Sequence, residues 1–211
     1  MIERKNFMGF LYTIMEWITR LAYLNILWIL FSLLGLFIFG LAPATVAVYT
    51  LARRWVMGDT DIKVFSTFWN TYKSEFLKAN FNMWPLILVG YILYIDFQYL
   101  AIFENILYYV MLFAFINVTI LYFVVCIYTF PVYVHYKKSL FQNYKFSLMI
   151  GFLNPFTSIL MGLFILVLAL ILERFLGLIP FFSVSVISCI LMWFSFNSFK
   201  KLEKKKQEGT E

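Results

Sequence analysis

The chain has 211 residues, of which 63% are apolar, 22% aromatic and 13% charged, with a formal net charge of +6. A soluble domain averages roughly 45–50% apolar and about 25% charged residues, so this composition excludes an ordinary soluble globule. The mean hydropathy of +0.85 and the long apolar runs instead predict an all-α, polytopic transmembrane helical bundle, with residues 1–211 forming a single integral membrane domain. Cys126 and Cys189 lie in apolar stretches and indicate neither a disulfide framework nor a metal site.

Five full spans are predicted in chain order from the apolar runs, at residues 21–39, 84–103, 106–134, 152–172 and 178–199. Lys and Arg cluster before the first span, between residues 42 and 83, after His135 and in the tail. The positive-inside rule therefore places all four segments, and both termini, in the cytoplasm. Five crossings leave the termini on opposite sides, so one more return across the membrane is expected between Leu41 and Arg53.

Prolines indicate where helices begin, because proline is tolerated in the first turn of a helix. We expect Pro85, Pro155 and Pro180 each to open a span. By the same reasoning Pro43 starts a short helix over residues 44–55, rich in the small residues that allow close helix packing in lipid. At about 1.5 Å per residue this segment is short for a bilayer, so a tilted sixth span and a re-entrant helix both stay open.

Three segments are expected at the membrane surface. Residues 1–20 form an interfacial N-terminal helix or lengthen the first span, and residues 200–211 form a basic cytoplasmic tail. Within residues 44–80, the short return helix is followed by a cytoplasmic amphipathic helix whose aromatic residues recur at helical spacing. That helix either lies in the lipid interface or docks a partner, and its interleaved aromatic residues argue against nucleic acid. The candidate partner-docking residues are Arg53, Arg54, Trp55, Asp59, Phe65, Phe68, Trp69 and Tyr72.

Catalytic chemistry has little support in the sequence, so no catalytic, cofactor-binding or metal-binding residue is assigned and the protein is not expected to be an enzyme. The chain has one histidine, His135, beside basic residues at the end of a span. The motifs of zincins, serine hydrolases and phosphate-binding loops are missing. The polar residues expected inside the membrane are Asn25, Asp96 and Asn117. Asp96 is either buried in the outer half of its span or, more cheaply, borders an outside loop with Glu104.

Several short motifs in the first 80 residues resemble the YesL family of small bacterial membrane proteins, and the later spans match that family mainly in their pattern. The motifs are Glu16-Trp17, Asn25-Ile26-Leu27-Trp28, Gly40-Leu41-Ala42-Pro43-Ala44, Arg54-Trp55, Gly58-Asp59, Phe65 and Phe68. The family is a domain of unknown function whose genes often accompany those of carbohydrate-uptake ABC transporters and their regulators. The resemblance therefore implies an accessory part in sugar uptake or its sensing, and it supplies no catalytic residues.

Three functional hypotheses follow. The favoured one is a non-enzymatic accessory or scaffold in the bacterial plasma membrane, with the bilayer, ABC permease subunits or a second copy as partners. The alternative is a small-molecule transporter or channel in its own right, with Asn25, Asp96 and Asn117 lining the path. An intramembrane enzyme is the third hypothesis, and it would need converging acids or an acid beside His135.

Overall fold

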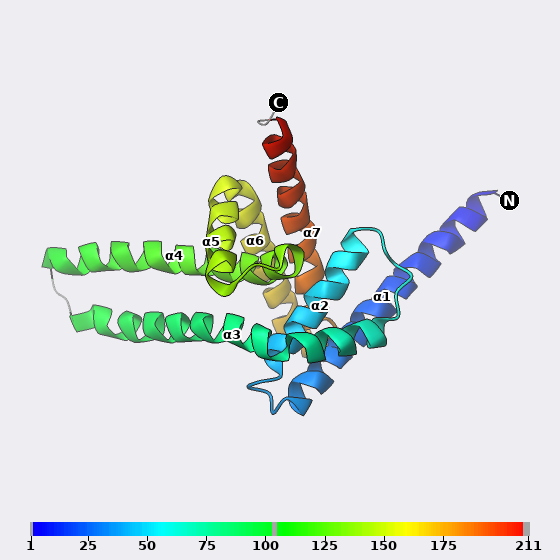
Figure 1. Cartoon of the computed structure of the whole chain (residues 1–211), viewed down its shortest axis with the longest axis horizontal. Coiled ribbons are helices and arrows are strands. Elements are labelled where there is room, and N and C mark those ends of the chain that lie inside the picture. The colour runs from blue at the N-terminus through cyan, green and yellow to red at the C-terminus, as the bar shows by residue number, and fades with distance from the viewer. Residues whose placement is uncertain (1, 103–104, 209–211) are drawn as a thin grey trace.

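The computed structural model describes residues 2–102 and 105–208, and within these ranges the chain is helical, without a strand. This confirms the all-α prediction. Glu104, which was predicted to lie in an outside loop, is not among the described residues. The long helices are α1 (Ile2–Leu34), α2 (Leu41–Val56), α3 (Val64–Tyr99), α4 (Asn105–Tyr136), α5 (Leu140–Leu153), α6 (Pro155–Arg174) and α7 (Ile179–Glu208) (Figure 1). Two short 3₁₀ turns, Leu100–Ile102 and Leu176–Leu178, precede α4 and α7.

Five of these helices are long and apolar enough to cross a membrane, as the sequence predicts. The candidate segments are Met8–Leu34, Val64–Tyr99, Asn105–Tyr136, Pro155–Arg174 and Leu176–Lys204. Each contains most of one predicted span. An apolar run of about 20 residues forms a helix in lipid, because its backbone groups have no hydrogen-bond partners there except one another.

The short helix α2 lies at the centre of the molecule, between two buried clusters (Figure 1). One face packs with Leu24 and Phe31 of α1 and Phe68 of α3. The opposite face packs with residues of α4 and α7, among them Tyr128 and Met192, in a cluster that also includes residues of α5 and α6. Most of α2 is buried because its small side chains let four other helices approach closely.

Helix boundaries agree with one open alternative and differ from the prediction in one place. The N-terminal segment lengthens the first helix, one of the two arrangements expected for residues 1–20, because α1 runs without a break from Ile2 to Leu34. Pro85 does not open a span but lies inside the 36-residue α3, which joins the expected amphipathic helix to the expected span. The Tyr144 hydroxyl donates a 2.5 Å hydrogen bond to the carbonyl of Asn82, three residues before Pro85.

The sequence analysis also missed α5, which follows α4 after a short connection. Pro155 and Pro180, by contrast, lie in the first turns of α6 and α7, as expected. The α5 segment was read as a cytoplasmic connection, but Asn143 is fully buried and donates to Asn82 Oδ1 and to the carbonyl of Thr129, both at 3.2 Å. Polar side chains therefore hold α5 against α3 and α4.

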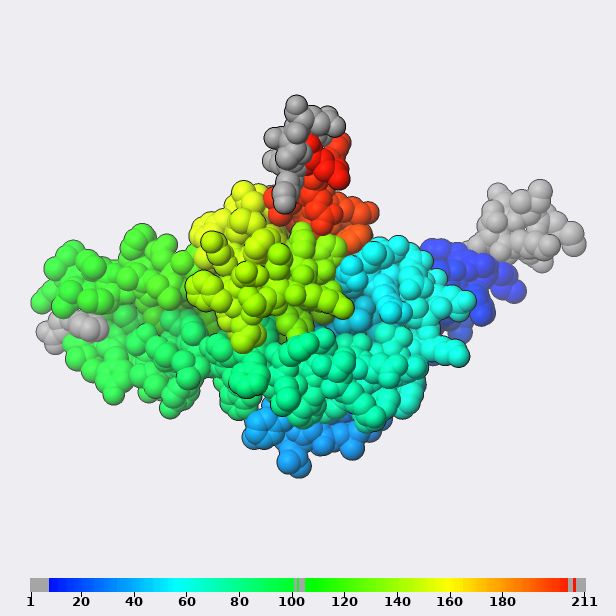
Figure 2. Space-filling view, in the orientation of Figure 1, coloured from blue at the N-terminus to red at the C-terminus, as the bar shows by residue number. Residues whose placement is uncertain are grey.

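The outer halves of α3 and α4 form a hairpin that extends beyond the other helices (Figures 1 and 2). The sequence did not predict this extension of two helices beyond the rest. Large apolar side chains such as Ile92, Phe97 and Phe113 are exposed along this hairpin. An apolar surface on all sides of a helix pair matches a hydrocarbon environment, where such side chains need no protein cover.

Candidate functional site

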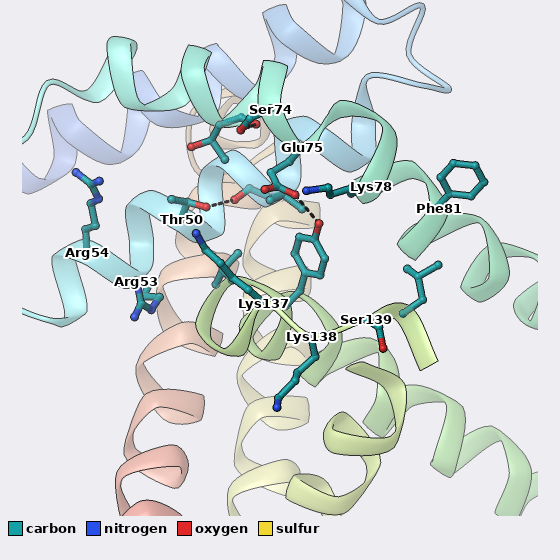
Figure 3. A pocket seen from close by; sticks show the side chains of 15 residues that line it. Thr50, Arg53, Arg54, Ser74, Glu75, Lys78, Phe81, Lys137, Lys138 and Ser139 are labelled. Carbon is teal, nitrogen blue, oxygen red and sulfur yellow. Dashed lines mark hydrogen bonds between the residues drawn. The ribbon is translucent and has the colours of Figure 1, made fainter. Parts of the chain in front are cut away.

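A pocket of about 590 Å³ lies where the C-terminal end of α2, the first half of α3 and the α4–α5 connection meet. Its lining includes five basic side chains from these three elements and one carboxylate (Figure 3). The basic residues are Arg53, Arg54, Lys78, Lys137 and Lys138, and the acid is Glu75. Lys78 extends toward Glu75 in this view, and Lys138 points outward. Five of the 17 Lys and Arg residues of the chain therefore meet at this one hollow.

The carboxylate of Glu75 is held by a neighbouring helix. The hydroxyl of Tyr133, near the end of α4, donates a hydrogen bond of 2.5 Å to Glu75 Oε2. This bond links α3 to α4 across the pocket and fixes the orientation of the carboxylate. One acid offsets one of the five basic charges, so the lining keeps a large positive excess at neutral pH.

Arg53 is positioned by a second set of contacts behind the pocket. Its Nε donates a 3.2 Å hydrogen bond to His135 Nδ1, and His135 Nε2 lies 3.4 Å from Glu203 Oε1. An accepting Nδ1 requires the proton of a neutral imidazole to be on Nε2, which then donates to Glu203. The chain of contacts joins α2, α4 and α7, and it orders the Arg53 side chain at the pocket wall.

The helix ends at the pocket have a strained residue between them. Lys137 follows the last residue of α4 with a φ of 47°, and its N–H bonds to the carbonyl of Tyr133 at 3.0 Å. This left-handed conformation closes the helix as glycine usually does, and it costs a residue with a Cβ roughly 1–2 kcal/mol. Ser139, two residues later, is the N-cap residue of α5 and also lines the pocket.

We expect Lys137→Gly to raise the free energy of unfolding by about 1 kcal/mol, because glycine adopts this conformation without a steric penalty. For a chain of this length the midpoint of thermal unfolding in mild detergent should rise by about 2–4 °C. Lys138→Gly is the matched control, since the backbone of Lys138 does not have a positive φ. That change should lower stability through added freedom of the unfolded chain. Equal losses in both variants would show that Lys137 is not strained.

The predicted docking residues are divided between the core and the surface. Trp55, Phe68 and Tyr72 are buried against α1 and α2, and Tyr72 donates to the carbonyl of Phe31 at 3.0 Å. These three side chains are therefore not free to dock a partner, which corrects the sequence interpretation. The aromatic face of α3 packs against the chain's own helices, because the ring of Phe31 in α1 contacts the rings of Phe68 and Tyr72. Trp69 is partly buried at that ring, and Arg53 is half-buried at the pocket, whereas Arg54, Asp59 and Phe65 are exposed.

The three predicted intramembrane polar residues have different surroundings. Asn25 is fully buried in the contact between α1 and α7 and is bonded to the backbone of α7. Asn117 is exposed, and its side chain donates to Phe113 of its own helix at 2.7 Å. Asp96 is exposed in the last turn of α3. The Asn25 amide is thus occupied by α7, which leaves it no role in lining a path with the other two.

The pocket itself was missed by the sequence analysis, apart from Arg53 and Arg54. Glu75, Lys78, Tyr133, Lys137 and Lys138 come from segments that no local motif connects. The only indication in the sequence was the clustering of basic residues at segment ends. Among the residues that the structure describes, no three His, Cys, Asp or Glu side chains lie close enough together to hold a metal ion.

Together, the apolar helices and the central short helix define a small all-helical chain of membrane-spanning character. A family model described as "Protein of unknown function, DUF624" matches residues 21–97. Two uncharacterized proteins of Bacillus subtilis (strain 168) are similar over nearly the whole chain. YteU is 35% identical over 96% of this chain and 91% of its own, and YesL is 36% identical over 91% and 90%. The chain belongs to this YesL-like family of unknown function. No solved structure matches it.

Proposed function

We propose that the chain is a non-enzymatic accessory protein of the bacterial plasma membrane that assists carbohydrate uptake by an ABC transporter or its regulation. The observation that carries the proposal is an exposed corner at the connection between α2 and α3, formed by Arg54, Asp59 and Phe65. Arginine and aromatic side chains are enriched at protein interfaces. The link to carbohydrate uptake rests on the genes that accompany the YesL family.

The proposed topology places this corner in the cytoplasm, together with both termini. Support comes from the basic residues near the ends of α2, α4 and α7, which favour the cytoplasmic side. The 16 residues of α2 reach about 24 Å, less than the roughly 30 Å of a hydrocarbon core. Because α1, α3, α4 and α7 surround α2, a short return helix at this position is shielded from lipid.

We expect permease subunits to co-purify with the tagged wild-type protein from its native membrane in a gentle detergent. The variant Arg54→Glu/Phe65→Ala should lose at least about 90% of that recovery, because central charged and aromatic contacts dominate binding energy. Mass spectrometry of the eluted proteins measures the recovery. Both side chains are exposed, so the variant is expected to fold, and its thermal unfolding midpoint checks this.

The matched control is Arg174→Glu/Phe175→Ala, which changes an exposed basic and aromatic pair at the C-terminal end of α6. This pair lies on the expected outer side and should leave recovery unchanged. If both variants retain the permease, the corner does not dock it. If the wild type is recovered alone, the accessory role is wrong, and substrate accumulation in proteoliposomes becomes the test of the transporter alternative.

A further inference from the structure

The charge balance of the basic pocket indicates that it takes an anion. Arg54, Lys78, Lys137 and Lys138 form no ion pair with the side chains that the structure describes. The carboxylate of Glu75 is the one acid in the lining, and it accepts from Tyr133. Like charges gathered in one hollow repel each other, and a bound anion with several oxygens removes this repulsion.

The backbone adds a second anion-binding element to the pocket. The 14-residue helix α5 begins at Leu140, and both Leu140 and its N-cap residue Ser139 line the pocket. The first N–H groups of a helix have no partner within the helix, and the helix dipole makes this end positive. The Ser139 side chain makes no capping bond to α5. The first amides of α5 are therefore not capped by the Ser139 hydroxyl. Lys137 and Lys138 line the same part of the pocket.

We propose that this pocket binds a phosphoryl group, carried by a small cytoplasmic ligand or by a lipid headgroup. A phosphoryl group has a charge near −2 at neutral pH and three strong acceptor oxygens. It matches lysines approaching from α3 and from the α4–α5 connection together with a helix N-terminus, a combination that recurs in phosphate sites. A volume of about 590 Å³ also leaves room for the group that carries the phosphate, since small-molecule pockets range over roughly 300–1,000 Å³.

The inference does not depend on the proposed role in uptake, since binding is tested on the purified protein without a permease. The full chain is placed in nanodiscs of phosphatidylcholine and unfolded thermally with inorganic phosphate, with succinate or with chloride at equal ionic strength. We expect phosphate to raise the unfolding midpoint in a saturable manner, and succinate and chloride to have much smaller effects. A second set of nanodiscs, of equimolar phosphatidylcholine and phosphatidic acid, tests the lipid headgroup.

The pocket variant is Lys78→Gln/Lys137→Gln, which removes one charge from α3 and one from the α4–α5 connection and leaves a neutral polar side chain one atom shorter at each position. Its apparent Kd for phosphate should rise at least about tenfold, because bonds to charged groups are among the stronger ones in proteins. Lys73→Gln/Lys145→Gln is the control. It makes the same change of charge on α3 and α5 at exposed positions outside the pocket lining, and it should bind phosphate like the wild type.

Each result decides a part of the inference. Stabilisation by phosphate that the pocket variant loses supports a free ligand, and stabilisation by phosphatidic acid that it loses supports a lipid headgroup. Equal responses of both double variants, or no response of the wild type to either phosphate source, would overturn the proposal. If the pocket variant does not fold, the single change Lys78→Gln at an exposed lysine gives the same comparison.

Discussion

Replacing Asn25 with leucine is expected to lower the free energy of unfolding by about 3 kcal/mol, because several buried hydrogen bonds are lost together. The Asn25 Nδ2 group donates to the carbonyls of Ile179 and Pro180 at 3.2 and 2.8 Å. Its Oδ1 accepts from the amides of Val184 and Ser185 at 2.9 and 3.0 Å. Leucine fills a similar volume but leaves these four backbone groups without their partner.

The position of Asn25 explains why the effect should be large. Its side chain is fully buried and joins α1 to the first turns of α7, which start about 155 residues later in the chain. A typical polar contact in a membrane protein is worth only about 0.6 kcal/mol, but here one side chain serves five contacts. The midpoint of thermal unfolding should fall by about 6–12 °C in mild detergent.

Asn117→Leu is the matched control, since it makes the same chemical change at an exposed residue of α4 whose side chain bonds only within its own helix. Its midpoint should change by less than about 2 °C. A fall of the same size in both variants would mean that polar side chains stabilise this chain without regard to position. No fall in either would show that α7 does not need the Asn25 side chain.

The long helices were predictable from sequence, because an apolar run of sufficient length has few alternatives in a membrane. A separate short helix near residues 44–55 was also predictable in outline, from Pro43 and the small residues that follow it. The extent of its burial was not, since composition does not say which helices surround it. Pro85 was misjudged because a proline inside a transmembrane helix is tolerated where neighbouring helices pack against it. Tyr144 of α5, a helix that the sequence analysis did not predict, bonds to the backbone carbonyl of Asn82 in the turn before Pro85.

The pocket was the least predictable feature, because its charge comes from residues far apart in the chain. Lys78 and Lys137 belong to α3 and to the α4–α5 connection, and the return of α4 beside α3 brings them to one hollow. Arg53 was singled out from sequence for its charge, but its contact with His135 was not expected. The aromatic residues of α3 were expected to meet the lipid interface or a partner, because periodicity alone does not show which helix covers an apolar face.

The turn between α1 and α2 has little space, and this makes glycine necessary at two positions. A Cβ on Gly40 would meet the carbonyl oxygen of Ser32 at less than a contact distance and that of Phe31 at 2.8 Å. A Cβ on Gly35 would meet the backbone of Gly40 in the same way. The obstacles are backbone atoms, which side-chain rotation does not move, so the helices must separate to accept a larger residue.

We therefore expect Gly40→Ala to lower the free energy of unfolding by about 3 kcal/mol, near the upper end for overpacked sites, with a fall of about 6–12 °C in the thermal midpoint. Two further contacts hold this turn. Asn80 of α3 donates to the carbonyl of Phe39 at 2.8 Å, and the Tyr72 hydroxyl of α3 donates to the carbonyl of Phe31 at 3.0 Å. A shift of the turn therefore disturbs α3 as well as α1.

Gly162→Ala separates the steric effect from the general effect of adding a methyl group. Gly162 lies inside α6, and an added Cβ there meets nothing within 4 Å. Alanine is favoured over glycine in a helix interior by roughly 1 kcal/mol, so this variant should unfold at an equal or higher temperature. Opposite shifts of the two midpoints would establish that the α1–α2 turn depends on direct backbone contact. A neutral Gly40→Ala would show that α2 has room to move relative to α1, and the close packing of the central helix would then be wrong.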